Sequence, residues 1–387
     1  MKMPLLKNIA ALVLLIILII VLIFPIPIHS NIGSGDFRPY WSSSFLLRNG
    51  QDFSNLSNMD WVERSQTNWR ESYTMSAWFA PTGNLILLPY TFLSFTRAVY
   101  YWLITNIFVV FLSAMLLWQH IKTHTWIPLG VFFTFSATLV SLYMGQVNTL
   151  VVLGLSLFIF LSTTKHEFLA GTCLILLTIK PQLVILTLPL LILNIFWQRK
   201  TRILAGFISA LVLCALILWS INLYWLNSFW QVITSGMSSF REAPTIPGLL
   251  VHAGYGYGKW LWMIVLSLAM LIWWKIKDKV NQRTLIDTTI LIGMLVSPIG
   301  WSYDHIILLI PLLHVFEWMV GNTLSKGNII AVALLLVITN SLSFYQRTLS
   351  VSEVWFFWIP LVSLIIYIFS WKQKLERTLG ATLIEAG

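Results

Sequence analysis

The sequence predicts an all-α protein that crosses a lipid bilayer many times. Hydrophobic residues make up 58% of its 387 positions and charged residues only 10%, whereas a soluble domain needs roughly 25% charged residues to cover its surface. Apolar runs long enough for membrane helices recur along the whole chain. This recurrence favours one continuous membrane domain, residues 1–387, over two or three soluble domains.

The charge distribution argues against a nucleic-acid-binding protein. The formal net charge is +10, but Lys and Arg occur in short clusters between the apolar runs. Such clusters orient membrane proteins, because loops rich in Lys and Arg stay in the cytosol. The two cysteines, Cys173 and Cys214, both lie inside apolar runs. A disulfide framework is therefore not expected.

The first apolar run, Leu5 to Ile28, predicts a membrane anchor. Lys2 and Lys7 lie at its start. The run is too long for a cleaved signal peptide and lacks a small-residue cleavage site. We expect the amino terminus in the cytosol, and Ser30 to Ala80, which contains no Lys, outside as a first outer loop.

The remaining runs predict about twelve spans in total, with both termini cytosolic, in a plasma (inner) membrane. Residues 81–95 are expected as a re-entrant or surface helix, because a span there would place later Lys clusters outside. Two short spans are expected to meet at Lys180. A second outer loop is expected at 223–258. The runs after the first are 98–118, 127–143, 149–163, 168–179, 183–197, 203–222, 259–274, 285–301, 305–320, 329–343 and 355–371.

Ionisable side chains near the membrane are candidates for function, because burying them there is costly. Asp36 follows the first span closely, and Gly33 and Gly35 allow the backbone to turn back toward the bilayer. This pattern predicts a carboxylate at the membrane surface. The alternative is a solvated turn in which Asp36 pairs with Arg38.

Polar groups between two pairs of apolar runs are further candidates for substrate binding. Lys180 lies between short spans, where its ammonium would meet a lipid phosphate, with Gln182 beside it. The alternative is a Lys that only extends to the headgroups. The amides of Gln146 and Asn148 could bind hydroxyl groups or could cap a turn.

A later outer connection contributes Asp304 and His305, which could serve as a second acid and a group facing phosphate, or could be structural. Arg241 in the second outer loop is a poorer candidate. The sequence shows no metal-ligand spacing, phosphate-binding glycine loop or nucleophile elbow. We therefore expect no metal and no cofactor.

Five segments, in their order along the chain, resemble glycosyltransferase family 87, which has the GT-C fold and uses polyprenol-phosphate sugars. The resemblance covers most of the chain up to about residue 320. The segments that carry it are GSGDFRPYW, WFAPTGNLILLPYTFL, MGQVNTLVVLGL, AGTCLILLTIKPQLVILTLPLL and SPIGWSYDHIILLIPLL.

The resemblance implies transfer of a sugar, often mannose, from a polyprenyl phosphate to a hydroxyl of a lipid or glycan acceptor on the outer face. Asp36 occupies the position of the family's general base, and His305 matches a histidine near the last functional outer loop. A single displacement inverts the anomeric carbon, and the acceptor proton must be removed while the leaving phosphate is neutralised.

Two other classes of protein stay open from the sequence. A secondary transporter or lipid flippase also has many spans, but such proteins usually show two related halves and polar residues near the midplane. The sequence shows no such repeat. A non-catalytic subunit of an envelope-polymer assembly machine is the third possibility.

Overall fold

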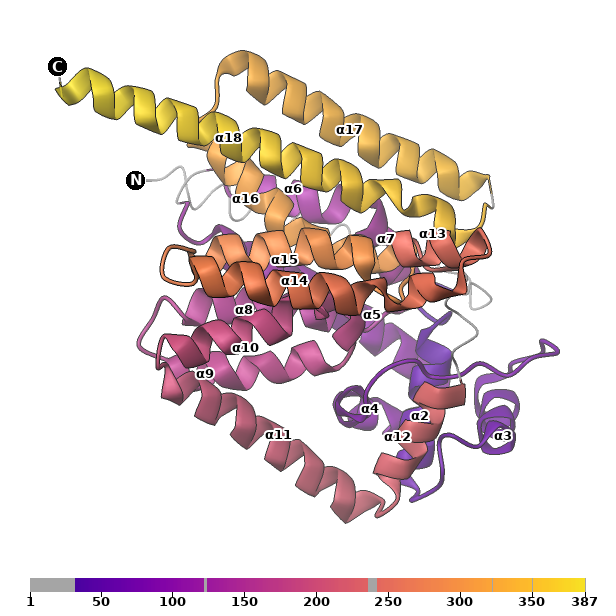
Figure 1. The fold of residues 1–387 in the computed structure, drawn as a ribbon. Helices are drawn as coiled ribbons and strands as arrows, with labels where there is room; N and C mark the ends of the chain where they lie inside the picture. The colour runs from indigo at the N-terminus through magenta and orange to yellow at the C-terminus, as the bar shows by residue number, and fades with distance from the viewer. Residues whose placement is uncertain (1–31, 122–123, 236–241, 322, 350, 387) are drawn as a thin grey trace, which may run out of the picture.

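The computed structural model describes residues 32–121, 124–235, 242–321, 323–349 and 351–386, and within these ranges every regular element is an α-helix or a 3₁₀-helix. Figure 1 shows the helices packed into one bundle. The predicted first span, 5–28, lies outside the described residues. The all-α prediction is thus confirmed for the part of the chain that is described.

The elements follow one another with short connections. The first group is α2 (Phe37–Arg48), α3 (Leu56–Thr67), α4 (Pro81–Leu87), η1 (Leu88–Phe92), α5 (Phe95–Trp118), α6 (Trp126–Thr134), α7 (Ser136–Met144) and α8 (Asn148–Leu161). The second is α9 (Glu167–Cys173), η2 (Leu174–Thr178), η3 (Pro181–Val184), α10 (Thr187–Trp197), α11 (Thr201–Ile221), α12 (Trp225–Ser235) and α13 (Ile246–His252). The third is η5 (Gly256–Trp260), α14 (Leu261–Ile276), α15 (Gln282–Val296), η6 (Ser302–Leu308), α16 (Leu309–Val320), α17 (Lys326–Thr348), η7 (Glu353–Phe356) and α18 (Trp358–Ala386).

Fewer candidate spans are found among the described residues than the sequence predicts for the whole chain. Six helical segments of the described chain are long and apolar enough to cross a bilayer, or seven if the bent pair α6 and α7 counts as one span. The prediction of about twelve spans is not confirmed. Three further apolar runs form shorter helical segments, at Asn148–Leu161, Glu167–Thr178 and Thr187–Trp197. Hydropathy alone did not distinguish these from full-length spans, because burial against protein and burial in lipid favour the same side chains.

The helices form a layered bundle. In Figure 1, α17 and α18 run side by side along one edge, α14, α15 and α16 lie beneath them, and α8, α9 and α10 lie beneath those. The tilted α11 forms the opposite edge against α9. This contact is close because Gly206 faces the backbone of α9: a Cβ on Gly206 would lie 2.0 Å from the carbonyl oxygen of Phe168.

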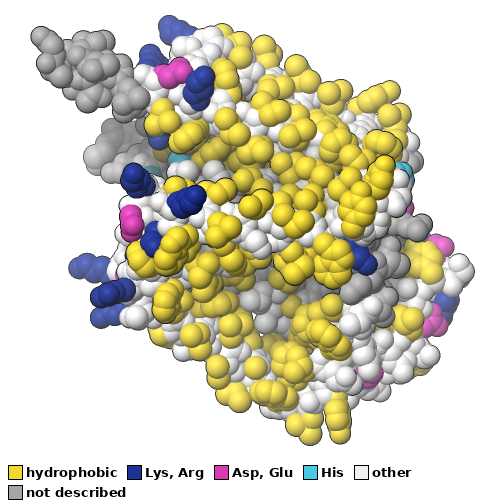
Figure 2. Space-filling view, viewed as in Figure 1, with side chains coloured by type: hydrophobic (Ala, Val, Ile, Leu, Met, Phe, Trp, Pro, Cys, Tyr) yellow, Lys and Arg dark blue, Asp and Glu magenta, His cyan; other side chains and the backbone are white. Residues whose placement is uncertain are grey.

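Basic side chains gather at one end of the bundle. Figure 2 shows a broad hydrophobic surface across the helices and most Lys and Arg along one edge, where the α14–α15 turn and the C-terminal half of α18 lie. This separation is what the positive-inside rule predicts for a membrane protein.

The segment 81–95 contains no helix long enough to cross a bilayer. Its helix α4 has only seven residues, which at about 1.5 Å each is far shorter than the hydrocarbon core. Ala80 donates its backbone N–H to the carbonyl of Ile179 at 2.9 Å, and Thr82 and Thr178 share a hydrogen bond at 3.1 Å. The segment therefore packs beside the chain that leads to Lys180.

A break between α6 and α7 is stabilised by α17. The two helices are bent by 64°. The side chain of Asn340 accepts a hydrogen bond from the backbone N–H of Ser136 at 2.8 Å and donates one to the carbonyl of Thr134 at 2.9 Å. The hydroxyls of Ser136 and Ser343 lie 2.7 Å apart. These bonds satisfy backbone groups that the break leaves unpaired, and they fix the direction of α7.

Candidate functional site

The loop that carries Asp36 is held against the C-terminal end of α7. The backbone N–H of Gly33 donates to Tyr143 at 2.6 Å, and that of Asp36 donates to Met144 at 2.8 Å. Gly145 ends α7 with φ +70°, and a Cβ there would lie 2.2 Å from the carbonyl oxygen of Gly33. Only glycine fits this approach. The contact places Asp36 beside Gln146.

The first turn of α2 is anchored on α5. The ring of Phe37 stacks on Trp102 with centroids 5.7 Å apart, and the indole N–H of Trp102 donates to the carbonyl of Gly145 at 2.8 Å. The amide of Asn106 donates to the carbonyl of Gln146 at 3.1 Å. Helix α5 therefore fixes both the acid-bearing loop and the turn after α7.

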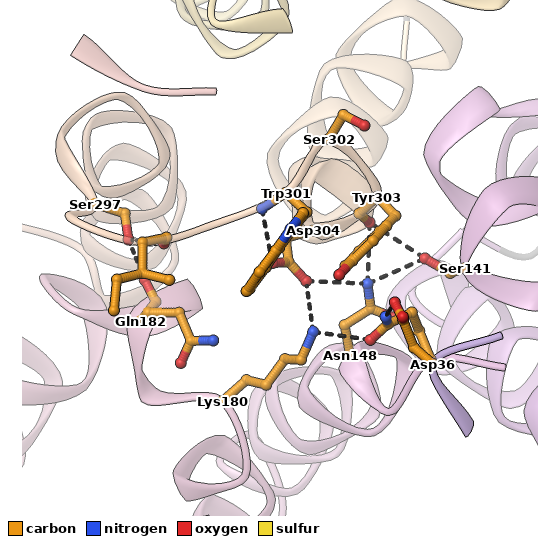
Figure 3. A network of polar contacts seen from close by, with 12 residues as sticks. Asp36, Ser141, Asn148, Lys180, Gln182, Ser297, Trp301, Ser302, Tyr303 and Asp304 are labelled. Carbon is orange, nitrogen blue, oxygen red and sulfur yellow. Dashed lines mark hydrogen bonds and ion pairs between the residues drawn. The ribbon is translucent and has the colours of Figure 1, made fainter. Parts of the chain in front are cut away.

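Five of the predicted site residues belong to one polar network: Asp36, Gln146, Asn148, Lys180 and Asp304. Gln146 donates from Nε2 to Oδ2 of Asp36, and its Oε1 accepts from the hydroxyl of Tyr40 at 3.1 Å and from Nζ of Lys180 at 2.8 Å. Nζ of Lys180 lies 3.1 Å from Oδ1 of Asp304. Figure 3 shows Asp36, Lys180 and Asp304 converging from separate parts of the chain. The network thus joins two carboxyl groups through the amide of Gln146 and the ammonium group of Lys180.

The carboxyl group of Asp304 is held on both oxygens. Oδ1 also accepts from Nδ2 of Asn148 at 3.3 Å, and Oδ2 accepts from the backbone N–H of Trp301 at 3.2 Å. Nδ2 of Asn148 lies 3.0 Å from the hydroxyl of Ser141 and 3.0 Å from the carbonyl of Tyr303. The start of η6 is thereby joined to α7 and α8.

Burial determines the electrostatics of the network. The side chains of Lys180 and Asp304 have no exposed surface, and Nζ of Lys180 lies 5.0 Å from the ring centre of Tyr303. Burial raises the pKa of Asp36 above its ordinary value, although the Lys180 charge and hydrogen bonds from Tyr303 and Gln146 oppose the shift. A raised pKa makes a carboxylate a stronger base.

Arg38 does not join this network and does not pair with Asp36. Its Nη1 donates to the carbonyl and the hydroxyl of Thr67, both at 2.6 Å, and its guanidinium lies over the ring of Trp69. Proximity in sequence suggested contact with Asp36 or with the donor. The structure shows that this side chain instead joins α2 to the end of α3.

Two other predicted residues, His305 and Gln182, also lie apart from the network. His305 is fully buried near the carbonyl of Pro244 and the guanidinium of Arg347, so it lies away from Lys180 although it follows Asp304 directly. The backbone carbonyl of Gln182, rather than its amide, accepts a hydrogen bond, from Ser297 at 3.1 Å. Arg241 lies outside the described residues.

Several residues of the network were not predicted from the sequence. Tyr40 lies one helical turn after Asp36, and this spacing could have identified it. Trp301 and Tyr303 precede Asp304 in the same resembling segment, but their spacing along a 3₁₀ turn does not show which side chains face inward. Ser141 resembles any small residue of an apolar helix. The described residues contain no cluster of three or more His, Cys, Asp or Glu side chains that could hold a metal ion.

Comparison with known proteins identifies the family. The model of glycosyltransferase family 87 matches residues 78–298, more than half of the chain, and this segment contains Gln146, Asn148 and Lys180. Asp36 and Asp304 lie outside the matched segment. No curated protein and no solved structure matches the chain. The resemblance predicted from the five sequence segments is confirmed, and the chain belongs to glycosyltransferase family 87, a family of sugar-transferring enzymes.

Proposed function

We propose that this membrane glycosyltransferase moves a sugar, with mannose favoured, from a polyprenyl-phosphate donor to a hydroxyl of a lipid or glycan acceptor. The observation that carries this proposal is the network of Asp36, Gln146, Lys180 and Asp304. It combines a carboxyl group of raised pKa with a buried ammonium group. Those are the two groups that such a transfer requires.

The proposed reaction is one displacement at the anomeric carbon. The acceptor oxygen bonds to that carbon while the bond from the carbon to the phosphate oxygen breaks, which inverts the configuration. Asp36 takes the acceptor proton, and the polyprenyl phosphate leaves with the bonding electrons. Lys180 stabilises the negative charge that develops on this phosphate. Because the step is single, no second carboxylate is needed as a nucleophile.

Lys180 can donate one further N–H hydrogen bond to the phosphate. An ammonium group carries three N–H donors, and contacts to Gln146 and Asp304 use two of them. Desolvation strengthens the attraction between Lys180 and an incoming phosphate, since few water molecules compete for the charge.

Asp36 is a better candidate for the base than Asp304. Both oxygens of Asp304 are occupied by fixed donors, Lys180 and Asn148 on Oδ1 and the backbone of Trp301 on Oδ2. These donors occupy the oxygen lone pairs that a substrate hydroxyl would need. Asp304 therefore positions Lys180 in this proposal, and Asp36 accepts the proton.

The active site is proposed to face outward, in the plasma membrane. Lys180 and Asp304 each lie near the end of a helix whose other end leads to basic residues. Helix α10 begins soon after Lys180 and ends before Arg199 and Lys200, and α15 begins at a Lys-rich turn and ends before Asp304. By the positive-inside rule, the basic ends are cytosolic and the network is on the other side.

Purified protein in lipid nanodiscs tests this function directly. We expect transfer of radiolabelled mannose from polyprenyl-phosphate mannose to an oligosaccharide or lipid acceptor, with release of polyprenyl phosphate and inversion at the anomeric carbon. A nucleotide-linked mannose serves as the control donor. Transfer from the nucleotide donor, with none from the lipid-linked donor, would refute the proposal.

A further inference from the structure

A groove lined by polar and apolar side chains lies on α3, apart from the network described above. It encloses about 630 Å³. The residues that line it occupy successive turns on one face of α3, together with one residue from the chain that returns past the helix. They are Leu56, Ser57, Asp60, Trp61, Arg64, Ser65 and Thr74.

The opposite face of α3 is packed against the rest of the protein. Met59, Val62 and Glu63 are buried there. The carboxylate of Glu63 accepts a hydrogen bond from the backbone N–H of Met75 at 3.0 Å, so the returning chain is held against the helix. The groove therefore lies on a fixed element, and its shape does not depend on a loose loop.

The groove combines a flat aromatic surface with paired donors and acceptors. The indole of Trp61 is 55% exposed. Nε of Arg64 donates to both oxygens of Asp60 at 2.8 Å, and the hydroxyl of Thr74 donates to Oδ1 of Asp60 at 2.8 Å. The hydrogen bond from Arg64 lowers the pKa of Asp60, which keeps this acceptor ionised near neutral pH. Ser57 and Ser65 add hydroxyl groups.

This is the chemistry that recognises a pyranose ring. The apolar C–H face of a sugar covers an aromatic ring, and neighbouring sugar hydroxyls hydrogen-bond to a carboxylate and a guanidinium at the edge. Arg64 also donates from Nη2 to the carbonyl of Glu71 at 3.0 Å. Its side chain is thus held in place before a ligand arrives, which lowers the entropy lost on binding.

The position of α3 connects the groove to the transfer site. Helix α2 begins directly after Asp36, and Arg38 in its first turn bonds to Thr67 in the last turn of α3. Figure 1 shows α3 at the edge of the bundle, on the side away from the C-terminus. We propose that this groove binds sugar units of a glycan acceptor whose terminal hydroxyl reaches Asp36. This inference rests on the proposed function.

Acceptor kinetics test the groove without disturbing the transfer site. Trp61→Ala and Asp60→Asn should raise the KM for a mannotetraose acceptor by roughly 3- to 10-fold, the loss expected for one stacking or hydrogen-bonding contact. The KM for methyl mannoside, which is too short to span both sites, and the KM for the donor should not change. Trp230→Ala removes another exposed indole, 65% exposed on α12, and should leave all three constants unchanged.

Direct binding separates failure of the groove from failure of the proposed function. If the wild-type protein transfers sugar but Trp61→Ala keeps its mannotetraose KM, the groove proposal is wrong. If the wild-type protein transfers no sugar, the proposed function is wrong. The groove proposal is then tested by mannotetraose binding to wild-type and Trp61→Ala protein, measured by thermophoresis. Equal affinities in that assay would overturn it.

A membrane anchor is the competing role for Leu56 and Trp61, because exposed Trp and Leu also enter headgroup regions. A nitroxide attached to Ser65→Cys keeps Trp61 and reports the environment of the groove. We expect relaxation by a water-soluble nickel complex. Relaxation by lipid-soluble oxygen alone would show that the groove lies in the bilayer, and would overturn the proposal.

Discussion

Lys180 and Asp304 form an ion pair, Nζ to Oδ1 at 3.1 Å, in which neither side chain is exposed. Burying both charges away from water is costly. Removing one partner leaves the other charge buried without a counter-charge, which destabilises a protein by about 3–5 kcal/mol. Such a pair is weak evidence for stability in itself. It does fix the ammonium group of Lys180 in the centre of the network, between Asp304 and Gln146.

Lys180→Gln should lower both turnover and donor affinity, because the departing phosphate then loses its counter-charge. Loss of one such stabilising group lowers kcat by a factor of roughly 10²–10³. The substitution also leaves Asp304 unpaired, so Lys180→Gln combined with Asp304→Asn is the control for folding. Donor KM and kcat are measured with polyprenyl-phosphate mannose. Unchanged kinetics in the folded variants would mean that Lys180 does not meet the phosphate.

Asn340 is expected to position the site through α7, although it lies on α17, beyond the segment that matches the family. Asn340→Leu leaves the backbone groups of Thr134 and Ser136 unpaired and should let α7 shift. Because α7 holds Asp36, kcat should fall by roughly 10-fold, as expected for a misplaced reacting group, and the acid limb of the pH profile should move.

Asn328→Leu is the matched control for Asn340→Leu. Asn328 lies on the same helix, and its amide donates to Gln373 on α18 at 2.8 Å. This variant also loses a hydrogen bond between helices, but it does not touch the break between α6 and α7. Its kcat and pH profile should equal those of the wild-type protein. Equal changes in both variants would show that Asn340 has only a general role in stability.

Glu63 should make the stability of the protein depend on pH. Burial raises its pKa from 4.5 to about 7, against the opposing effects of the Met75 N–H and Arg38. A raised native pKa favours the folded state below the unfolded pKa, and this contribution is lost as pH rises through about 7. The melting temperature of the wild-type protein should therefore fall relative to that of Glu63→Gln between pH 5 and 8. Parallel melting curves across this range would contradict the assignment.

The proposed orientation predicts which positions a membrane-impermeant thiol reagent can reach. Lys277 lies in the turn after α14, with its ammonium 3.2 Å from the ring centre of Trp274. Lys277→Cys should be labelled only after the cells are opened, and Ser65→Cys should be labelled in intact cells. Labelling of position 277 in intact cells would contradict the proposed orientation.

The sequence identified much of the candidate site because polar residues are rare in this chain. Asp36, Gln146, Lys180 and Asp304 were all selected as costly groups near the membrane, and the structure brings them together. Their contacts could not be predicted, because they depend on how distant helices pack. Arg38 illustrates this: it lies two positions from Asp36, yet its contacts are with Thr67 and an aromatic ring.

The fold was predicted in class but not in detail. Hydropathy located α8 and α10 as apolar runs, but it could not show that they are short, because neither lipid nor protein neighbours are visible in a sequence. The break between α6 and α7 could not be predicted from a Pro or Gly at the bend, because the residue there is Phe135. Its stabilising partner, Asn340, is a polar residue in an apolar run, and that anomaly was the available signal.

Comparison of Asp36→Asn with Asp304→Asn tests the central claim most directly. Asparagine keeps the shape of each side chain and removes its basicity. Loss of a general base lowers the rate by roughly 10²–10⁴. Both purified variants are assayed with polyprenyl-phosphate mannose, and donor binding is measured separately. We predict that Asp36→Asn loses turnover and still binds the donor. Normal turnover by Asp36→Asn, with loss of turnover by Asp304→Asn, would contradict the assignment of Asp36 as the base.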